Sequence, residues 1–294
     1  MRAEAESRAP RRAGRRARRL RRLGLGALKA LAVAAILLWS LAPILLIVTS
    51  SLKPEREIFA VPPVLAFRPT FDHYAALWAR WPDFFVALGN SLVVTALATV
   101  FAVFASLLSG YAYSRFRARW LDASAFLLIV VRLVPPIVMT LPLFPAANAL
   151  GFQDTHLWLA VLYATFFVSL GSFVMRAFID QIPRELDEAA AVDGAGRFTT
   201  LFRVITPLAA QGMMAVAVFV VVYAWNEFLF AFVFTSTRAK TAPLVLAEVV
   251  GSFDGVDWGV LFAAATVQLL PVLAFVWLTQ KYLVAGLTAG ATKG

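Results

Sequence analysis

The sequence predicts an all-α membrane protein with six transmembrane helices. Hydrophobic residues make up 61% of the chain and charged residues 15%, whereas soluble domains contain about 45–50% apolar and about 25% charged residues. Most of this apolar surface therefore needs lipid as its solvent. An α-helix needs about 20 apolar residues to cross a hydrocarbon core of about 30 Å. Six stretches reach that length: 27–50, 85–109, 121–143, 157–179, 208–235 and 258–282.

The first stretch follows an arginine-rich segment with ten arginines from Arg2 to Arg22. Such segments occur in nucleic-acid-binding tails. Here a membrane span follows at once, which favours contact with anionic lipid headgroups. A secretory signal peptide also joins a basic and an apolar region. The apolar run is too long for a typical signal and no convincing small-residue cleavage site follows it, which favours an uncleaved span.

Basic residues also predict the orientation, because loops rich in Lys and Arg stay on the cytoplasmic side. The N-terminal segment is strongly basic, and so are the connections around 115–119 and 184–203. With six spans, both termini and these two connections are then cytoplasmic. The predicted division is an Arg-rich cytoplasmic tail (1–26), a first transmembrane helix (27–50), a periplasmic loop (51–84), a core of five helices (85–282) that includes the loop 180–207, and a cytoplasmic C-terminal tail (283–294).

Prolines lie inside several predicted spans. Each removes a backbone hydrogen bond and can kink the helix, and neighbouring helices or a water-lined cavity must satisfy the freed carbonyls. They therefore favour a bundle with an internal passage. Aromatic residues in the loop 51–84 are interpreted as a belt at the outer membrane interface rather than as a ligand platform. The prolines within spans are Pro43, Pro135, Pro136, Pro142 and Pro271.

The chain lacks the residues of several common catalytic and metal sites. It has no cysteine and two histidines, His73 and His156, which stand far apart in the sequence. This argues against disulfides, cysteine-ligated clusters and an HExxH zinc site. No GxxxxGK[ST] loop is present to hold ATP, so any ATP must be bound by another subunit. No paired carboxylates or nucleophile–base set indicates an enzyme.

One polar segment, 184–197, stands out between the fourth and fifth apolar stretches. Pro183 suits the first turn of a helix, and the acidic residues that follow are stabilised by the positive N-terminal end of a helix. The three alanines at 189–191 favour the helix, and Gly194 and Gly196 can end it with positive φ. A second short helix, approximately 198–204, then leads into the fifth span.

The spacing of this segment resembles a known signature. The triplet Glu-Ala-Ala at 188–190, Gly194 and Pro207 resemble the EAA signature, EAA-x3-G-x9-I-x-L-P, of permease subunits of bacterial binding-protein-dependent ABC importers. The chain departs from it at Val204 and Thr206. Further segments resemble the sugar-importing branch, in particular the shorter permease of maltose-type systems, and the resemblance covers about 27–294. These segments are 51–54, 90–92, 110–116, 134–137, 142–144, 150–155, 182–186, 224–228 and 284–290.

The resemblance implies a type I ABC importer permease fold in the bacterial cytoplasmic (inner) membrane, with the polar segment as a cytoplasmic coupling helix. It implies that Glu188 meets a basic residue of an ATPase subunit. Ala189, Ala190 and Gly194 then shape the contact, and Pro207 belongs to the same ATPase-coupling motif. The alternative is a solvated connector whose charges only cap helices.

The resemblance also implies the partners. Two ATPase subunits bind ATP and Mg²⁺, a second homologous permease completes the pathway, and an extracytoplasmic binding protein delivers a sugar or related polyol. The chain itself then catalyses nothing and binds no cofactor, metal or nucleic acid. Its C-terminal segment 286–294 either docks on the ATPase pair or is a frayed end.

Five residues at membrane depth are candidates for the translocation pathway. Ionisable groups there are costly and mark functional sites, and planar polar groups with aromatic faces recognise sugars. The same residues can instead pair with neighbouring helices or the partner permease. Pairing is favoured, because the resemblance implies that most substrate contacts lie in the other permease. The five are Arg132, Trp225, Asn226, Glu227 and Gln268.

Two functional alternatives stay open. An ion-coupled secondary transporter needs titratable groups or broken helices at the membrane midplane. Glu227 is the only carboxylate well inside the predicted spans, which argues against proton coupling. The second alternative keeps the ABC permease role with a non-sugar cargo such as glycerol phosphate. A phosphate cargo favours basic groups in the passage, and Arg132 is the only candidate.

Overall fold

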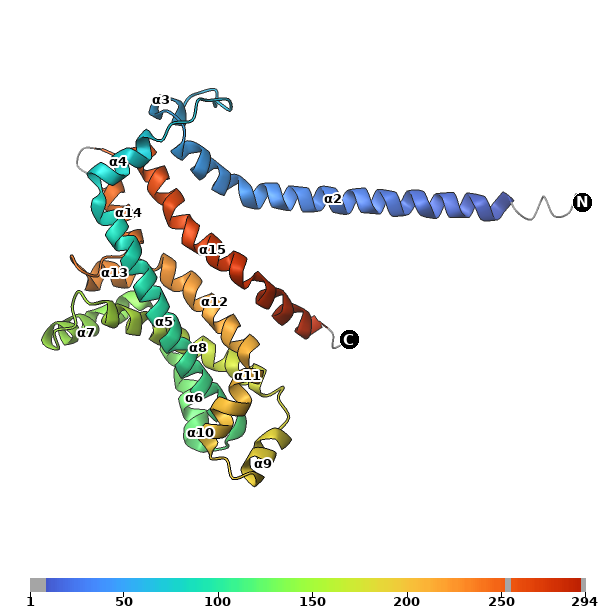
Figure 1. Cartoon of the computed structure of the whole chain (residues 1–294), viewed down its shortest axis with the longest axis vertical. Coiled ribbons are helices and arrows are strands. Elements are labelled where there is room, and N and C mark those ends of the chain that lie inside the picture. Colours follow the sequence, from blue (N-terminus) through green and yellow to red (C-terminus); the bar gives the residue numbers. More distant parts are fainter. Residues whose placement is uncertain (1–8, 252–254, 292–294) are drawn as a thin grey trace, which may run out of the picture. The chain divides into compact units, whose positions relative to one another are not determined.

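The computed structural model describes residues 9–251 and 255–291, with side chains described for 24–251 and 255–280. All regular secondary structure in this described part is helical, and no strand occurs in it (Figure 1). The all-α prediction is therefore confirmed. The chain forms two compact units, Met1–Phe71 and Asp72–Gly294.

The first unit is built on one long helix, α2, which spans Ala9–Ser51. This helix continues from the arginine-rich segment through the predicted first span without a break, and Pro43 lies inside it. Its part Gly24–Ser51 contains an 18-residue window with a mean hydropathy of 2.7 and is long enough to cross a membrane. Residues 1–8 of the predicted tail lie outside the described residues.

The segment after α2 folds back on the end of that helix. α3, Glu55–Ile58, is a single turn. Thr70 donates its backbone N–H to the carbonyl of Leu52 at 2.9 Å. The Nζ atom of Lys53 lies 5.4 Å from the centre of the Phe67 ring. These contacts hold the end of the segment 52–70 against its beginning, next to the C-terminal end of α2.

The second unit begins with α4 and the long helix α5 and continues through bundled helices to α15 (Figure 1). Its elements are α4 (Asp72–Arg80), α5 (Pro82–Arg115), α6 (Arg119–Arg132), α7 (Pro136–Ala149), α8 (His156–Ile179), α9 (Glu185–Val192), α10 (Arg197–Thr199), the π-helix η1 (Thr200–Ile205), α11 (Thr206–Leu208), α12 (Ala210–Asn226), α13 (Leu229–Phe234), α14 (Ala242–Val250) and α15 (Trp258–Ala291).

Four helices in the described part are long and apolar enough to cross a membrane, and two bent helix pairs raise this to six if each pair is one span. The helices α5, α8 and α15 contain the predicted spans 85–109, 157–179 and 258–282. α15 also continues to Ala291, through most of the predicted C-terminal tail, while 292–294 lie outside the described residues.

The predicted span 121–143 is wrong as a single helix. α6 ends at Arg132, α7 begins at Pro136, and the two helices are bent by 101°. Proline has no N–H and disfavours helical backbone in the residue before it. Pro135 has a ψ of 134°, outside the helical range. Two adjacent prolines therefore break this helix where the sequence predicted a kink.

The predicted span 208–235 is also wrong as a single helix. α12 ends at Asn226, Glu227 has an extended backbone with φ −71° and ψ 129°, and α13 follows. The Glu227 carboxylate accepts the N–H groups of Phe230 at 2.9 Å and Ala231 at 3.3 Å. It thus satisfies the first donors of α13, which no helical carbonyl reaches. At the other end of α12, the segment Arg197–Leu208 meets this helix at 77°.

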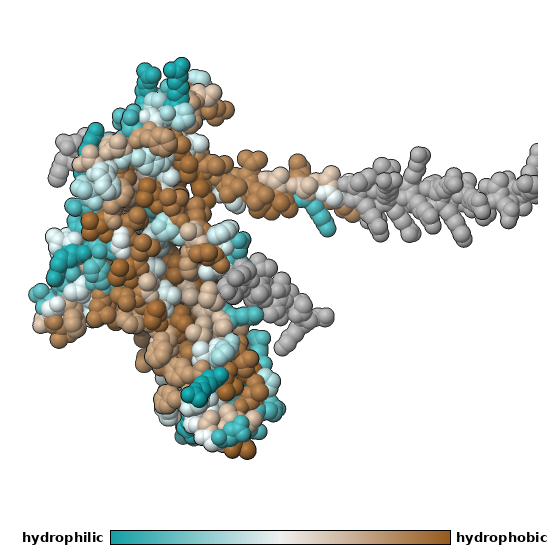
Figure 2. Space-filling view, in the orientation of Figure 1, coloured by the Kyte–Doolittle hydropathy of each residue, from teal (hydrophilic) through white to brown (hydrophobic). Residues whose placement is uncertain are grey.

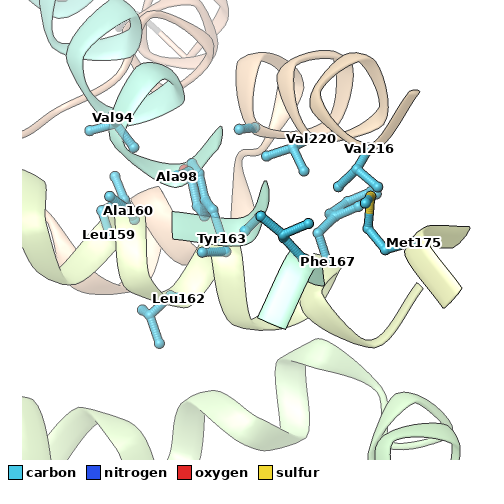
Figure 3. Packing of buried hydrophobic residues seen from close by; sticks show 14 of the residues in the cluster. Val94, Ala98, Leu159, Ala160, Leu162, Tyr163, Phe167, Met175, Val216 and Val220 are labelled. Carbon is cyan, nitrogen blue, oxygen red and sulfur yellow. The ribbon is translucent and has the colours of Figure 1, made fainter. Parts of the chain in front are cut away.

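The main core lies where α5, α8 and α12 meet, and Figure 3 shows side chains of these helices packed together. Glycines bring α5 and α8 unusually close. A Cβ atom at Gly110 would lie 2.5 Å from Cβ of Met175, and one at Gly171 would overlap the side chain of Ser106. Small residues of this kind let two helix backbones approach in a membrane, where close packing drives association.

A second core joins α4, the beginning of α5, α14 and α15 through Leu77, Phe84, Val245 and Val260. Outside both cores, large hydrophobic side chains stay exposed over much of the helical surface (Figure 2). Soluble monomers rarely expose apolar areas of this extent. Such a surface suits contact with lipid or with other membrane-spanning chains.

Candidate functional site

The polar segment folds as predicted around α9. Three acidic residues occupy the first turn of this helix, where its dipole stabilises them. After the helix, Ala195 N–H bonds to the Ala190 carbonyl at 2.8 Å and Gly194 N–H to the Ala191 carbonyl at 3.0 Å. This pair of bonds is a Schellman turn. Gly194 has a φ of +81°, which confirms its predicted role, whereas Gly196 has a φ of −72°, so its predicted positive φ is wrong.

The second helix of the segment is mostly a π-helix, where an α-helix was predicted. The sequence predicts a short helix at 198–204. The structure has one turn of α-helix followed by the π-helix η1. Pro207, just after η1, has no N–H to donate to the preceding turn. The Leu201 carbonyl accepts both the backbone N–H of Thr206 and its hydroxyl, the latter at 2.8 Å. π-helical turns are rare and occur frequently at functional sites.

The outer side of the segment exposes both charged and apolar side chains. Glu188 and Ala189 are exposed, and Ala190 is half-buried. Val192 is 87% exposed and Phe198 73% exposed. Large apolar side chains beside charged ones, on a short polar helix that projects from the bundle (Figure 1), are typical of a surface that another protein covers.

The inner side of α9 is joined to the end of α5. The Arg115 side chain is 7% exposed, and its Nε donates to Oδ2 of Asp187 at 3.0 Å. Its Nη2 donates to the Ile182 carbonyl at 2.9 Å, and its Nη1 to the Ser114 hydroxyl at 3.2 Å. The Tyr111 hydroxyl donates to Oδ1 of the same aspartate at 3.3 Å. Both carboxylate oxygens of Asp187 are thus held by α5.

The turn between α8 and α9 adds two more bonds to the same end of α5. The Ser114 hydroxyl donates to Oδ1 of Asp180 at 2.6 Å. Arg184 Nη2 donates to the Ser114 carbonyl at 2.8 Å. We call the set Tyr111, Ser114, Arg115, Asp180, Arg184 and Asp187 the α5–α9 junction.

The sequence did not predict this junction. Arg115 indicated only the orientation of a loop, and Asp187 only the beginning of a helix. The two residues are 72 positions apart, and no local spacing links them. The segment 110–116, which resembles the permease family, contains Arg115, and Asp187 directly follows the second such segment, 182–186.

The predicted pathway residues of α12 and α15 bond mostly within the bundle. Trp225 Nε1 donates to the Gln268 carbonyl at 3.1 Å and so joins the two helices. Glu227 is buried and caps α13. The exposed Asn226 bonds to the Val222 carbonyl of its own helix at 2.7 Å. The side-chain oxygen of Gln268 is buried and has no hydrogen-bond partner within the described residues.

Arg132 lies apart from these residues, at the break between α6 and α7. Its guanidinium carbon is 5.3 Å from the centre of the Phe166 ring and 5.9 Å from that of Phe167. Its Nη1 donates to the Ser169 hydroxyl at 3.4 Å. It lines a cavity of about 180 Å³ that also includes Thr165. Among the described side chains, no carboxylate forms an ion pair with it.

A second polar cluster lies at the beginning of α8. Asp154, in the turn before this helix, accepts backbone N–H groups from 236–239 at 2.9–3.2 Å. Partial burial opposes ionisation of the Asp154 carboxyl. The N–H groups of Arg238 and Ala239, with the Thr237 hydroxyl and the Ser236 N–H, outweigh it, so the pKa of Asp154 is lowered well below its usual range. No group of three metal-ligating side chains occurs among the residues described.

Comparison with known proteins identifies the family. Residues 99–288 match the family described as binding-protein-dependent transport system inner membrane component. The trehalose transport system permease protein SugB of Mycobacterium tuberculosis is 36% identical over 260 residues, which cover 87% of this chain and 93% of the relative. The trehalose/maltose transport system permease protein MalG of Thermococcus litoralis is 33% identical over 242 residues, covering 82% and 87%.

The fold also matches a solved transporter. One chain of a bacterial ABC transporter for import of the acidic polysaccharide alginate superposes with a TM-score of 0.73 at 19% identity, over 88% of this chain and 96% of that one. This match concerns the fold alone, whereas the family match and the two permeases confirm the resemblance to ABC importer permeases. The chain therefore belongs to the binding-protein-dependent transport system inner membrane components, the permease subunits of ABC transporters, and is a multi-pass protein of the cytoplasmic membrane.

Proposed function

We propose that this chain is one of two permease subunits of an ATP-driven sugar importer, and that α9 is the helix that couples it to an ATPase subunit. The observation that carries the proposal is α9 itself. It combines the EAA spacing with an exposed Glu188, and exposed Val192 and Phe198 lie beside it. Family membership and the permease relatives support the transport role.

The proposed topology has six spans and both termini cytoplasmic. α6 and α7 together form the third span, and α12 and α13 together form the fifth, with the segment Arg197–Leu208 on the cytoplasmic side. This topology rests on the positive-inside rule. Arginines gather where α5 ends, α6 begins and α9 lies, which favours a cytoplasmic position for this end of the bundle. They are Arg115, Arg117, Arg119, Arg184, Arg197 and Arg203.

In the proposed mechanism, two ATPase subunits bind ATP and Mg²⁺, and this chain binds neither. Glu188 pairs with a basic residue of one ATPase, and the small Ala189 and Ala190 let that subunit approach closely. When the ATPase pair closes, α9 moves with it as a rigid body and carries the attached spans. The central cavity then changes from inward-facing to outward-facing. A homologous permease forms the other half of the pathway.

The proposed cargo is a sugar or related polyol, delivered by an extracytoplasmic binding protein. The names of the relatives refer to trehalose and maltose, and the solved transporter imports alginate. A non-sugar cargo such as glycerol phosphate is the second candidate, and Arg132 beside its cavity is the residue that favours an anion. A ligand screen on the cognate binding protein distinguishes the two.

The ion-coupled alternative is disfavoured. The chain belongs to a binding-protein-dependent transport family. The carboxylate of Glu227, which proton coupling would require to titrate, is instead bonded to two backbone N–H groups. Transport by the reconstituted complex should therefore survive a protonophore and stop when ATP is removed.

The coupling proposal is tested by reversing the charge of Glu188 in the complete importer. Like charges facing each other across an interface cost several kcal/mol, so Glu188→Lys should lower ATPase co-purification and transport by about tenfold or more. Glu185→Lys is the matched control, because Glu185 is exposed on the same helix and lies outside the EAA triplet. Unchanged ATPase association and transport in the Glu188 variant would contradict the proposal.

A further inference from the structure

The α5–α9 junction has a geometry that helix capping does not require. Within the described part of the chain, the side-chain hydrogen bonds of α9 are those of Asp187, and both go to α5. Glu188, the next residue, is exposed and points about 100° further around the helix. Neighbouring carboxylates therefore face in different directions. One is directed into this protein and the other out of it.

The link between α9 and α5 is stiff. Arg115 is nearly buried and bonds to a carboxylate, a backbone carbonyl and a hydroxyl at 2.9–3.2 Å. Its planar guanidinium holds these partners in fixed directions. Breaking a buried ion pair by removing one partner leaves an uncompensated charge, which is strongly destabilising. The pair therefore resists opening when α9 is pushed or pulled.

α5 is in turn fastened to α8 along its length. Gly110 packs against Met175 and Gly171 against Ser106, with no room for a Cβ atom at either glycine. The hydroxyls of Ser109 and Ser172 share a hydrogen bond of 2.6 Å between the same two helices. A displacement that reaches the end of α5 therefore moves α8 with it.

We propose that Arg115 and Asp187 form a strut through which α9 drives α5 and α8 as one body. This rests on the proposed role of α9 as the coupling helix. The chain connects α9 directly only to α8 and, through η1, to α12. The strut adds α5 as a third attachment and prevents α9 from pivoting on its flanking turns. Arg115 and Asp187 are positioning residues, and Glu188 remains the contact with the ATPase.

The strut predicts a specific defect when Asp187 loses its charge. In proteoliposomes with the complete importer, Asp187→Asn should still assemble with the ATPase subunits and hydrolyse ATP. Cargo transported per ATP hydrolysed should fall by about tenfold, because α9 can then move without carrying α5. A brace needed only for folding would lower the amount of complex and leave this ratio unchanged.

Four further variants sharpen the test. Asp187→Glu keeps the charge and should recover most of the ratio. Arg115→Lys keeps the charge but loses the planar fork, so its ratio should fall as in Asp187→Asn, and combining the two changes should add little because they act on one contact. Asp193→Asn, an exposed aspartate just after α9, is the matched control and should behave as wild type.

The outcomes separate the strut from the coupling role. If Asp187→Asn and Arg115→Lys both keep the wild-type ratio while Glu188→Lys loses ATPase association, the strut is wrong and the coupling proposal stands. If Glu188→Lys is also without effect, the coupling proposal fails as well. Should Asp187→Asn not accumulate in the membrane, Tyr111→Phe removes only the 3.3 Å hydroxyl bond to Asp187. A wild-type ratio in both Tyr111→Phe and Arg115→Lys then overturns the strut.

Discussion

The two ends of α8 are held in different ways. At its beginning, Asp154 binds the backbone N–H groups of the segment 236–239, and Asn90 of α5 donates to the carbonyls of Arg238 and Lys240, at 2.9 Å each. At its end, the α5–α9 junction is made largely by side chains, among them the Arg115–Asp187 pair. The first contact fastens a loop through its backbone. The second joins two helices through their side chains.

This difference corresponds to what each end leaves exposed. The loop 236–239 uses its backbone donors internally, so its path is set from within the chain. At the other end, the inner side of α9 is bonded while Val192, Phe198 and Glu188 remain exposed. We call the contact of Asp154 with the segment 236–239, at the beginning of α8, the closure, because its groups bond within the chain. We call the α5–α9 junction, at the end of α8, the joint, because the helix that it holds still exposes a surface to a partner.

The largest effect on stability is expected at the closure. Asp154→Ala removes the acceptor for the N–H groups of 236–239 and for two hydroxyls. Losing these bonds to a charged acceptor should cost about 1.5–3 kcal/mol and lower the thermal unfolding midpoint of the purified importer, followed by tryptophan fluorescence. Asp193→Ala, at an exposed aspartate just after α9, should leave the midpoint unchanged. Equal midpoints for the two variants would remove the distinction between closure and joint.

At the joint, an effect on association and not on stability is expected. Val192→Ser together with Phe198→Ser removes apolar surface that a partner would cover, worth about 1.5–3 kcal/mol for each large side chain. ATPase association should weaken by at least about tenfold, with an unchanged unfolding midpoint of the permease. Val250→Ser on α14 is the control, since Val250 is 48% exposed and lies far from α9 in the chain. Equal loss of association in the control would contradict a partner surface at α9.

Much of this arrangement follows from local sequence signals. The apolar runs predicted α5, α8 and α15, and the acidic first turn, the alanines and Gly194 predicted α9 and its Schellman turn. The breaks in the other two spans had local causes that were misjudged. Pro135 and Pro136 were interpreted as a kink. Glu227 was a pathway candidate, and the structure shows its carboxylate capping α13.

The two contacts that hold the ends of α8 could not be predicted in the same way. Asp154 and the segment 236–239 are more than 80 positions apart, and Arg115 and Asp187 are 72 apart. Each pairing depends on how the helices pack, and that packing depends on close contacts such as Gly110 against Met175. Composition and periodicity carry no information about which aspartate meets which donor. Only the folded chain supplies it.

The smallest effect, and the sharpest test of the closure, is its dependence on pH. The pKa of Asp154 in the folded protein lies below that of an unfolded aspartate, which is about 3.9. The stabilisation from this carboxylate is therefore fully present above the unfolded pKa and is lost as the pH falls through it towards the folded pKa. Asp154→Asn keeps the shape of the side chain but cannot ionise, so residue 154 contributes no pH dependence to the stability of this variant.

The measurement is the difference in unfolding midpoint between wild type and Asp154→Asn. It should be constant above about pH 5, where the wild-type carboxylate is ionised in both states, and should shrink as the pH is lowered through about 4. Other carboxylates titrate in this range too, but they are present in both proteins and cancel in the difference. A difference that stays the same, or grows, as the pH falls would show that Asp154 does not hold the segment 236–239 through its charge. The closure at the beginning of α8 would then depend on the shape of the turn, with no need for an anion within it.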